Sequence, residues 1–400
     1  MIVALTGLVV SLFAYLIAFP DRDRRRFDVY LPLLLLHVAM AVAYWLYHFE
    51  AAMDAFTYYR DPYNFYQQFG PLSSGTHFIT WVVQTLRSAV GGSFLDYFLL
   101  FQCFGMIGFA LLIRSFIEVA DSLQTEVPWL LYLLLFLPGL HFWSVAIGKD
   151  APMFMAVALA VWASIRIGRR FVWMALAVAA MLLIRPHVGA VVMLAVFVAF
   201  ITARGVSPIT RLVLIPPAIA GLVATLLMAG EQLGIDFSDA ETVTDFVQYQ
   251  QGLNETMGSG ASIASLPFPL KVFTLLFRPL FFDAAGAMAY AVSFENVALL
   301  FLFGALAAYW RDLFRLMGRV YHVTFCAVFS VTLIIGLSLV NYNLGLGQRQ
   351  KMMVMPAVLL IFATIYLYRR YLAAAAQAAA LEPGPEPARP AVAAGARQAG

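Results

Sequence analysis

Two apolar runs flanking a basic segment decide the fold, and all three lie in the first 47 residues. The runs are IVALTGLVVSLFAYLIAF at residues 2–19 and YLPLLLLHVAMAVAYWLY at residues 30–47, and DRDRRR at residues 21–26 separates them. An α-helix of about 20 apolar residues crosses the hydrocarbon core of a bilayer. We therefore expect a hairpin of two spanning helices, with the basic segment at one membrane surface.

The same pattern recurs along the whole chain. Hydrophobic residues make up 62% of the sequence and charged residues 12%, with a mean hydropathy of +0.84. A soluble core cannot absorb so many apolar side chains in 400 residues. Continuous rather than alternating runs argue against a barrel. We predict an all-α, polytopic membrane protein. Its spans, about eleven in number, are expected at residues 2–19, 30–47, 98–113, 129–145, 151–165, 171–184, 188–202, 212–229, 287–308, 320–340 and 352–367. The spans at 171–184 and 188–202 could instead form one broken hairpin.

The distribution of arginine and lysine predicts the orientation. Short loops rich in these residues stay in the cytoplasm. The segment at 21–26 is therefore predicted to be cytoplasmic and the N-terminus to be outside. Alternation places the basic loops near 166–170, 204–211, 311–319 and 369–370 on the cytoplasmic side too, whereas the loop at 114–126 has no basic excess.

A single integral membrane domain is expected at residues 1–370, with large outer regions at 48–96 and 231–286. The first of these contains a predicted interfacial helix at 76–89. The Ala-, Pro- and Gly-rich stretch at 371–400 is predicted to be a disordered cytoplasmic tail.

Eight of the 25 basic residues are predicted to lie on the outer side, where positive charge is normally scarce. They include all three lysines of the chain, and most stand in short motifs marked by aromatic residues, Pro or Gly. The pattern indicates an anion-binding site, for which a lipid-linked diphosphate is the obvious ligand. The eight residues are Arg60, Arg87, Lys149, Arg185, Lys271, Arg278, Arg349 and Lys351.

The segment YYRDPYNFY at residues 58–66 follows the second span. Tyr58, Tyr63 and Tyr66 offer aromatic faces for sugars, and Arg60 is a further polar contact. Asp61 could accept the proton of an attacking sugar hydroxyl. The alternative is a belt of interfacial tyrosines with a local Arg60–Asp61 pair.

The segment HFWSVAIGKD at residues 141–150 lies between two predicted spans. Gly148 allows a tight turn, and Asp150 could cap the next helix or act as a base. Lys149 near that helix N-terminus creates a local anion site, and Trp143 could stack on a sugar. A plain capped turn with a lysine reaching the interface is the alternative.

The segment LIRPH at residues 183–187 interrupts an apolar stretch. Pro186 is expected to end the preceding helix, where Arg185 and His187 emerge. The planar guanidinium of Arg185 suits phosphate, and His187 could be a base or a phosphate donor. An ordinary short outer loop is the alternative.

Two later segments repeat this chemistry. FRPLFFD at residues 277–283 pairs Arg278 with a proline among aromatic residues, an arrangement that interfacial anchoring explains nearly as well. NYNLGLGQRQK at residues 341–351 precedes the last span, and its glycines would let Arg349 and Lys351 approach a ligand closely.

Polar residues in or near other spans point to structure rather than function. His37, Glu295 and His322 are isolated, and we interpret them as satisfied polar groups or helix-end groups. The sequence contains no nucleotide-binding, zinc-protease or Cys/His metal motif, so no metal, cofactor or nucleic acid is expected. The cytoplasmic loops are too short for a soluble catalytic domain, which places any chemistry at the membrane.

Taken together, the Trp-Ser…Gly-Lys-Asp turn, the Arg-Pro-His break, the Phe-Arg-Pro motif and the Asn…Gly…Arg…Lys segment resemble a known family. They are similar to the bacterial O-antigen and exopolysaccharide repeat-unit polymerases (Wzy-type proteins and relatives). The resemblance covers most of residues 1–370 and implies a multi-pass protein of the bacterial inner membrane. It also implies that Arg185, Arg278 and Arg349 contact the diphosphate of a polyprenyl-linked glycan, with membrane lipid and other polysaccharide-assembly proteins as partners.

The expected reaction forms a glycosidic bond on the outer face without a nucleotide sugar. The arginines and Lys149 would stabilise the leaving diphosphate, and Asp61, Asp150 or His187 would deprotonate the acceptor hydroxyl. One alternative is a transferase that moves a single sugar from a polyprenyl-phosphate donor, with Asp61 as its acidic residue. The sequence is also compatible with a transporter or flippase for lipid-linked glycans, or with a non-enzymatic assembly partner.

Overall fold

The computed structural model describes residues 1–21, 26–49, 54–71, 73–204, 239–255, 266–284, 286–340 and 344–381, together with position 263 and separate positions between 209 and 230. The described residues form helices and no strand, so the predicted all-α class is confirmed. The helices are α1 (Ile2–Phe13), α2 (Tyr15–Ala18), α3 (Phe27–Tyr47), α4 (Asp54–Arg60), α5 (Phe65–Gln68), α6 (Thr76–Val90), α7 (Phe94–Ser122), α8 (Trp129–Leu133), η2 (Leu134–Phe136), α9 (Pro138–Trp143), α10 (Asp150–Ile165), α11 (Ile167–Ile184), α12 (Pro186–Thr202), α14 (Ala240–Glu255), α15 (Phe268–Phe277), α16 (Ala287–Ala308), α17 (Trp310–Leu316), α18 (Tyr321–Val340), α19 (Leu344–Lys351) and α20 (Met355–Leu381).

Six helices within the described residues are long and apolar enough to cross a membrane: α3, α7, α11, α16, α18 and α20. Shorter apolar helices accompany them: α1 with α2, α10, α12 and α15. Several of these helices expose large apolar side chains, as lipid-facing surfaces do. The chain is therefore a helical membrane protein with several candidate spans.

The structure differs from the sequence prediction in two places, and a third prediction lies mostly outside the described residues. The expected span at 129–145 is divided into α8, η2 and α9, because Pro138 lacks a backbone N–H and starts a new helix. Helix α20 continues to Leu381, so residues 371–381 are helical rather than a disordered tail. Alanine, which is common there, is the strongest helix former, and residues 382–400 lie outside the described part. The expected span at 212–229 is described only at separate positions.

Helix α7 is the central element of the bundle. It packs against α1, α3, α10 and α20, and most of its residues are buried. Glycines permit this close approach: a Cβ on Gly7 would lie 2.0 Å from the Leu99 carbonyl oxygen, and one on Gly108 would lie 2.6 Å from the Phe154 ring. Small residues let helix backbones meet inside membranes, where the hydrophobic effect adds little to helix association.

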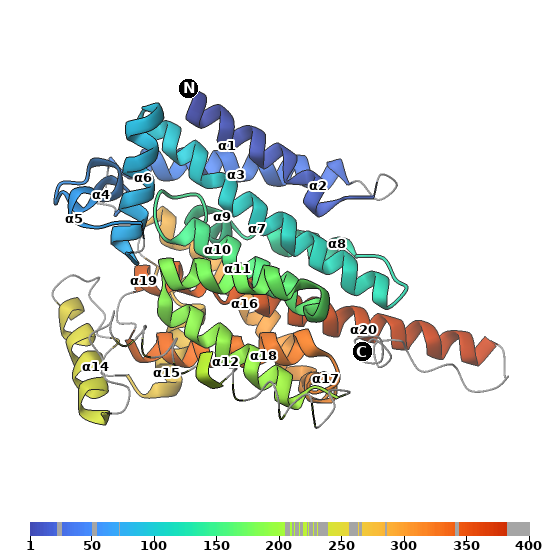
Figure 1. Ribbon diagram of the computed structural model, residues 1–400. Coiled ribbons are helices and arrows are strands. Elements are labelled where there is room, and N and C mark those ends of the chain that lie inside the picture. The colour runs from blue at the N-terminus through green and yellow to red at the C-terminus, as the bar shows by residue number, and fades with distance from the viewer. Residues whose placement is uncertain are drawn as a thin grey trace.

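The polar segments that the sequence predicts to lie outside gather at one end of this bundle. In Figure 1, α4, α5, α6 and α19 lie at its left end, whereas α8 and α17 lie toward the right. The predicted helix break is confirmed, because α11 ends at Ile184 and α12 begins at Pro186. This break, α4, α19 and the start of α10 supply the residues of the candidate site.

Candidate functional site

A chain of ion pairs joins four separate segments at the site. Asp150, the first residue of α10, is 2% exposed, and its Oδ1 accepts a hydrogen bond of 2.5 Å from Arg185 Nη2. Its Oδ2 accepts from Arg349 Nε of α19. The same guanidinium reaches Asp54 at the start of α4, with 2.7 Å between Arg349 Nη1 and Asp54 Oδ2. One buried carboxylate thus fixes two arginines.

Lys149 adds a third cation beside these two. Its Nζ lies 3.3 Å from Thr76 Oγ1 of α6, and no carboxylate of the described residues approaches it within ion-pair distance. Burial and the charges of Arg185 and Arg349 lower the pKa of Lys149 to about 8. The ammonium therefore lies in the field of two guanidiniums without a direct counter-ion.

We call Lys149, Arg185, Arg349, Asp54 and Asp150 the cation cluster. Its three cations exceed its two carboxylates by one positive charge. Burial tends to raise the pKa of Asp54, but the neighbouring Arg349, Lys149 and Arg185 lower it overall, so this carboxylate stays charged. The Nε of Arg185 is buried and has no hydrogen-bond partner among the described residues. Excess charge and an unused donor both suit an incoming anion.

The local backbone explains how Lys149 reaches this position. Gly148 adopts φ +151, a conformation that side chains disfavour, and a Cβ there would lie 3.1 Å from the Tyr58 ring. Two contacts hold the covering segments in place: Gly75 N donates to the Leu183 carbonyl at 2.8 Å, and Gln84 Nε2 donates to the Tyr58 carbonyl at 2.8 Å. Helices α4 and α6 thereby cover the turn that carries Lys149.

Two of the three predicted bases have other roles in the structure. Both oxygens of Asp150 are held by arginines. Asp61 accepts hydrogen bonds from the backbone N–H groups of Phe65 and Tyr66, at 2.8 and 2.9 Å, and so caps α5. His187, in the first turn of α12, lies within the electrostatic influence of Arg185 and Lys149, and no described residue hydrogen-bonds to its ring.

The side chains of three predicted anion contacts do not take part in the ion pairs of the cation cluster, and each contacts another residue. The sequence alone could not separate these residues from Lys149 and Arg185, because their motifs have the same type of composition. The Nε of Arg278 donates to Asp283 Oδ2 at 2.5 Å, the Nζ of Lys351 donates to Asn296 Oδ1, and Arg60 lies 5.4 Å from the centroid of the Phe56 ring.

The predicted sugar-stacking residues differ in accessibility. Tyr58 is 2% exposed and packs over Gly148, so its face is not free for a sugar. Trp143 is half-buried against Phe142. Tyr63, at 62% exposed, and the half-buried Tyr66 remain accessible.

Sequence reasoning missed Asp54, which contributes the second carboxylate. It stands one helical turn before Tyr58, a spacing that places both side chains on one face of α4, and this was the available signal. A second polar centre was also missed: Lys351 meets Asn296, while the neighbouring Glu295 accepts from Gly139 N at 2.5 Å. These contacts tie α19 and α9 to α16.

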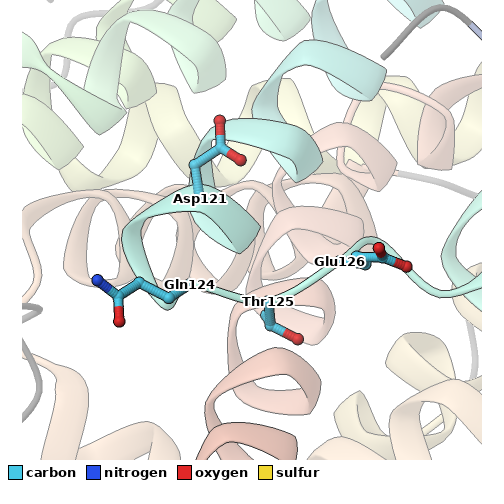
Figure 2. Close-up of a pocket in the computed structure, with 4 residues that line it drawn as sticks. All are labelled: Asp121, Gln124, Thr125 and Glu126. Atoms are coloured by element: carbon cyan, nitrogen blue, oxygen red, sulfur yellow. The ribbon is translucent and has the colours of Figure 1, made fainter. Parts of the chain in front are cut away.

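An open pocket lies just beyond the C-terminal end of α7, lined by Asp121, Gln124, Thr125 and Glu126. Its four side chains point in different directions rather than toward one another (Figure 2). The pocket carries two carboxylates and shares no residue with the cation cluster. It therefore has neither the charge nor the converging donors that an anion site requires.

No protein-family model, curated protein or solved structure matches this chain.

Proposed function

We propose that this protein is a membrane glycosyltransferase that joins polyprenyl-diphosphate-linked oligosaccharides on the outer face of a bacterial inner membrane. The observation that supports this most directly is the cation cluster, with its excess positive charge, the Lys149 ammonium and an Arg185 Nε that no described residue pairs with. Arginine and lysine donors held close together bind phosphate oxygens strongly. A polyprenyl chain would extend from such a site into the surrounding lipid.

We further propose about eleven spans, with the N-terminus outside and the C-terminus in the cytoplasm. Support comes from the basic residues near the opposite end of α7. Glu118 is fully buried there and accepts from Arg114 Nε at 2.9 Å and Arg170 Nη2 at 2.8 Å, with Arg166 Nε at 3.5 Å. Clustered arginines are typical of a cytoplasmic membrane surface, which would place the cation cluster outside.

In the proposed reaction, Arg185, Arg349 and Lys149 stabilise negative charge on the departing phosphate. Donors that are already fixed in place are effective because they need little reorganisation as this charge develops. His187 is the remaining proposed base for the acceptor hydroxyl, because the carboxylates of Asp61 and Asp150 are already engaged. Tyr63 and Tyr66 would offer aromatic faces to the sugars.

A second candidate is the transfer of one sugar from a polyprenyl-phosphate donor. The single excess positive charge of the cation cluster matches a singly charged phosphodiester. Arg278 and Lys351, which would have helped to neutralise a diphosphate, have partners elsewhere. A flippase for lipid-linked glycans would bind the same phosphate headgroup. The experiment below distinguishes it from both transferases.

The test is mass spectrometry of lipid-linked glycans in a strain that lacks the gene. The strain is complemented with wild type, Lys149→Gln or Arg185→Ala, with Arg87→Gln as a control. Arg87 is an outer arginine that contacts Tyr59 instead of the cation cluster.

Complete single repeat units accumulating on the outer face would indicate a polymerase. Units lacking one sugar would indicate a single-sugar transferase, and complete units trapped on the inner face would indicate a flippase. Rescue by Arg87→Gln but not by the two cluster variants would place the phosphate at the cation cluster. Unchanged glycans in the deletion strain would overturn the proposal.

A further inference from the structure

Two histidines form a continuous hydrogen-bonded chain inside the bundle, outside the cation cluster. His37 of α3 and His141 of α9 face each other with 2.9 Å between their Nδ1 atoms. The other nitrogen of each ring meets a backbone carbonyl. His37 Nε2 lies 2.9 Å from the Gln102 carbonyl oxygen of α7, and His141 Nε2 lies 2.8 Å from that of Leu135 in η2.

The number of protons in this chain follows from its acceptors. A carbonyl oxygen only accepts, so each Nε2 must carry a proton to complete its contact. The contact between the two Nδ1 atoms requires one more proton, and only one, because two N–H groups cannot face each other at 2.9 Å. Three protons complete the chain, whereas two neutral imidazoles carry two between them.

A neutral pair therefore leaves one contact incomplete. If the shared proton belongs to His141 Nδ1, then His141 Nε2 is unprotonated and its lone pair faces the Leu135 carbonyl. In the opposite tautomer the mismatch moves to His37 and the Gln102 carbonyl. We infer that His37 and His141 form a binding site for one proton, which the two rings hold jointly.

The residues around the pair determine how far a positive charge on it is favoured or opposed. Both histidines are fully buried, and burial opposes the added charge. The ring of Phe109 stacks on His141 with centroids 4.4 Å apart. Its electron-rich face therefore lies against the ring that would carry the charge. Two further elements pack against α9: α16, whose Glu295 accepts from Gly139 N, two residues before His141, and α19, which carries Arg349 and Lys351. Among the described residues, no carboxylate, lysine or arginine of α3, α7, α9 or η2 acts on either ring, and His141 is the charged neighbour that acts on His37.

Close packing around Gly105 holds the two rings in this arrangement. A Cβ on Gly105 of α7 would lie 2.5 Å from His37 Nε2 and 2.4 Å from the Ser144 carbonyl oxygen, so the glycine admits both. The pair thus spans α3, α7 and α9, and α9 leads into the turn that carries Lys149. This proton site is independent of the proposed glycosyl transfer, since it contains none of the residues of the cation cluster.

The test counts protonated ring nitrogens by NMR on the full-length protein, labelled with ¹⁵N at histidine and held in detergent micelles. The chain contains six histidines, and His37→Gln and His141→Gln assign the signals of the pair. His322→Gln is the control, because His322 is also buried but its one hydrogen bond to a described side chain is with Thr364 Oγ1, at 3.1 Å. Circular dichroism defines the pH range in which the helices persist.

On acidification within that range, the pair is expected to gain one proton, so that three of its four nitrogens carry hydrogen. Four protonated nitrogens, or two throughout the range, would overturn the inference. Phe109→Leu provides a second variant that leaves both histidines in place. It is expected to shift proton uptake to lower pH, and an unchanged titration would contradict the stabilising role of the aromatic face.

Discussion

We predict that the loss of the Asp150 carboxylate strongly lowers the free energy of unfolding, because this one buried group pairs with two arginines. The side chains of Asp150, Arg185 and Arg349 are 3%, 9% and 17% exposed, so none of the three is well solvated. Asp150→Asn removes the negative charge and leaves both guanidiniums without it. Breaking a buried ion pair in this way costs about 3–5 kcal/mol, since the remaining charge stays desolvated.

Asp54→Asn is the matched control, because Asp54 contacts the same Arg349. Its side chain is 59% exposed, so solvent screens the pair. Its loss should cost at most about 1 kcal/mol. Both variants are measured by reversible unfolding in mixed micelles, followed by the fluorescence of the seven tryptophans.

A double variant separates the ion pair from general effects of the substitution. Asp150→Asn combined with Arg349→Gln should cost less than the sum of the single changes by about 0.5–3 kcal/mol, because each removes a partner of the other. Equal costs for Asp150→Asn and Asp54→Asn would refute the assignment of Asp150 as the shared carboxylate, and so would strict additivity in the double variant.

Three further predictions concern the same end of the bundle. Binding of a polyprenyl phosphate in micelles should weaken as pH rises through about 8, where the Lys149 ammonium loses its charge, and Lys149→Gln should remove this part of the pH dependence. Asp61→Ala removes the cap of α5 and should lower the unfolding free energy by about 1 kcal/mol. The same substitution should leave phosphate affinity unchanged, because the Asp61 carboxylate is already engaged by backbone N–H groups. Loss of a residue that binds phosphate would instead lower the affinity. Gly148→Ala should cost about 1–3 kcal/mol in unfolding free energy and weaken phosphate binding. Gly304→Ala, with no atom within 4 Å of the added Cβ, should be neutral or stabilising.

The helices were predictable where one physical rule dominates. The run at 287–308 is α16 as predicted, because length and apolar composition alone define a spanning helix. The segment at 129–145 has the same composition, but Pro138 and the packing of α9 against α3 divide it. Apolar content could not reveal that division, although the proline was visible.

The candidate site was predictable in part. Lys149, Arg185 and Arg349 were expected to act together, and the structure places them around Asp150. Arg278 and Lys351 come from similar motifs but pair elsewhere. Whether such a residue joins the cation cluster depends on partners that are distant in the sequence. Asp54 and Arg349 are 295 positions apart, and no local pattern in a single sequence specifies such a pair.

Positive charge alone does not locate the functional end of this bundle. The group around Glu118 also has more arginines than carboxylates, and two of its three arginines donate hydrogen bonds to that carboxylate. Arg114 and Arg170 both donate to Glu118, and the guanidinium of Arg170 also stacks over Trp162 at 3.7 Å. At the cation cluster a buried donor, Arg185 Nε, has no acceptor within the part of the chain that the structure describes. A buried donor without an acceptor is costly, so a site that retains one favours a ligand that supplies the missing oxygen. The proposed phosphate site therefore rests on this unused donor together with the excess charge of the cation cluster, and not on the charge alone.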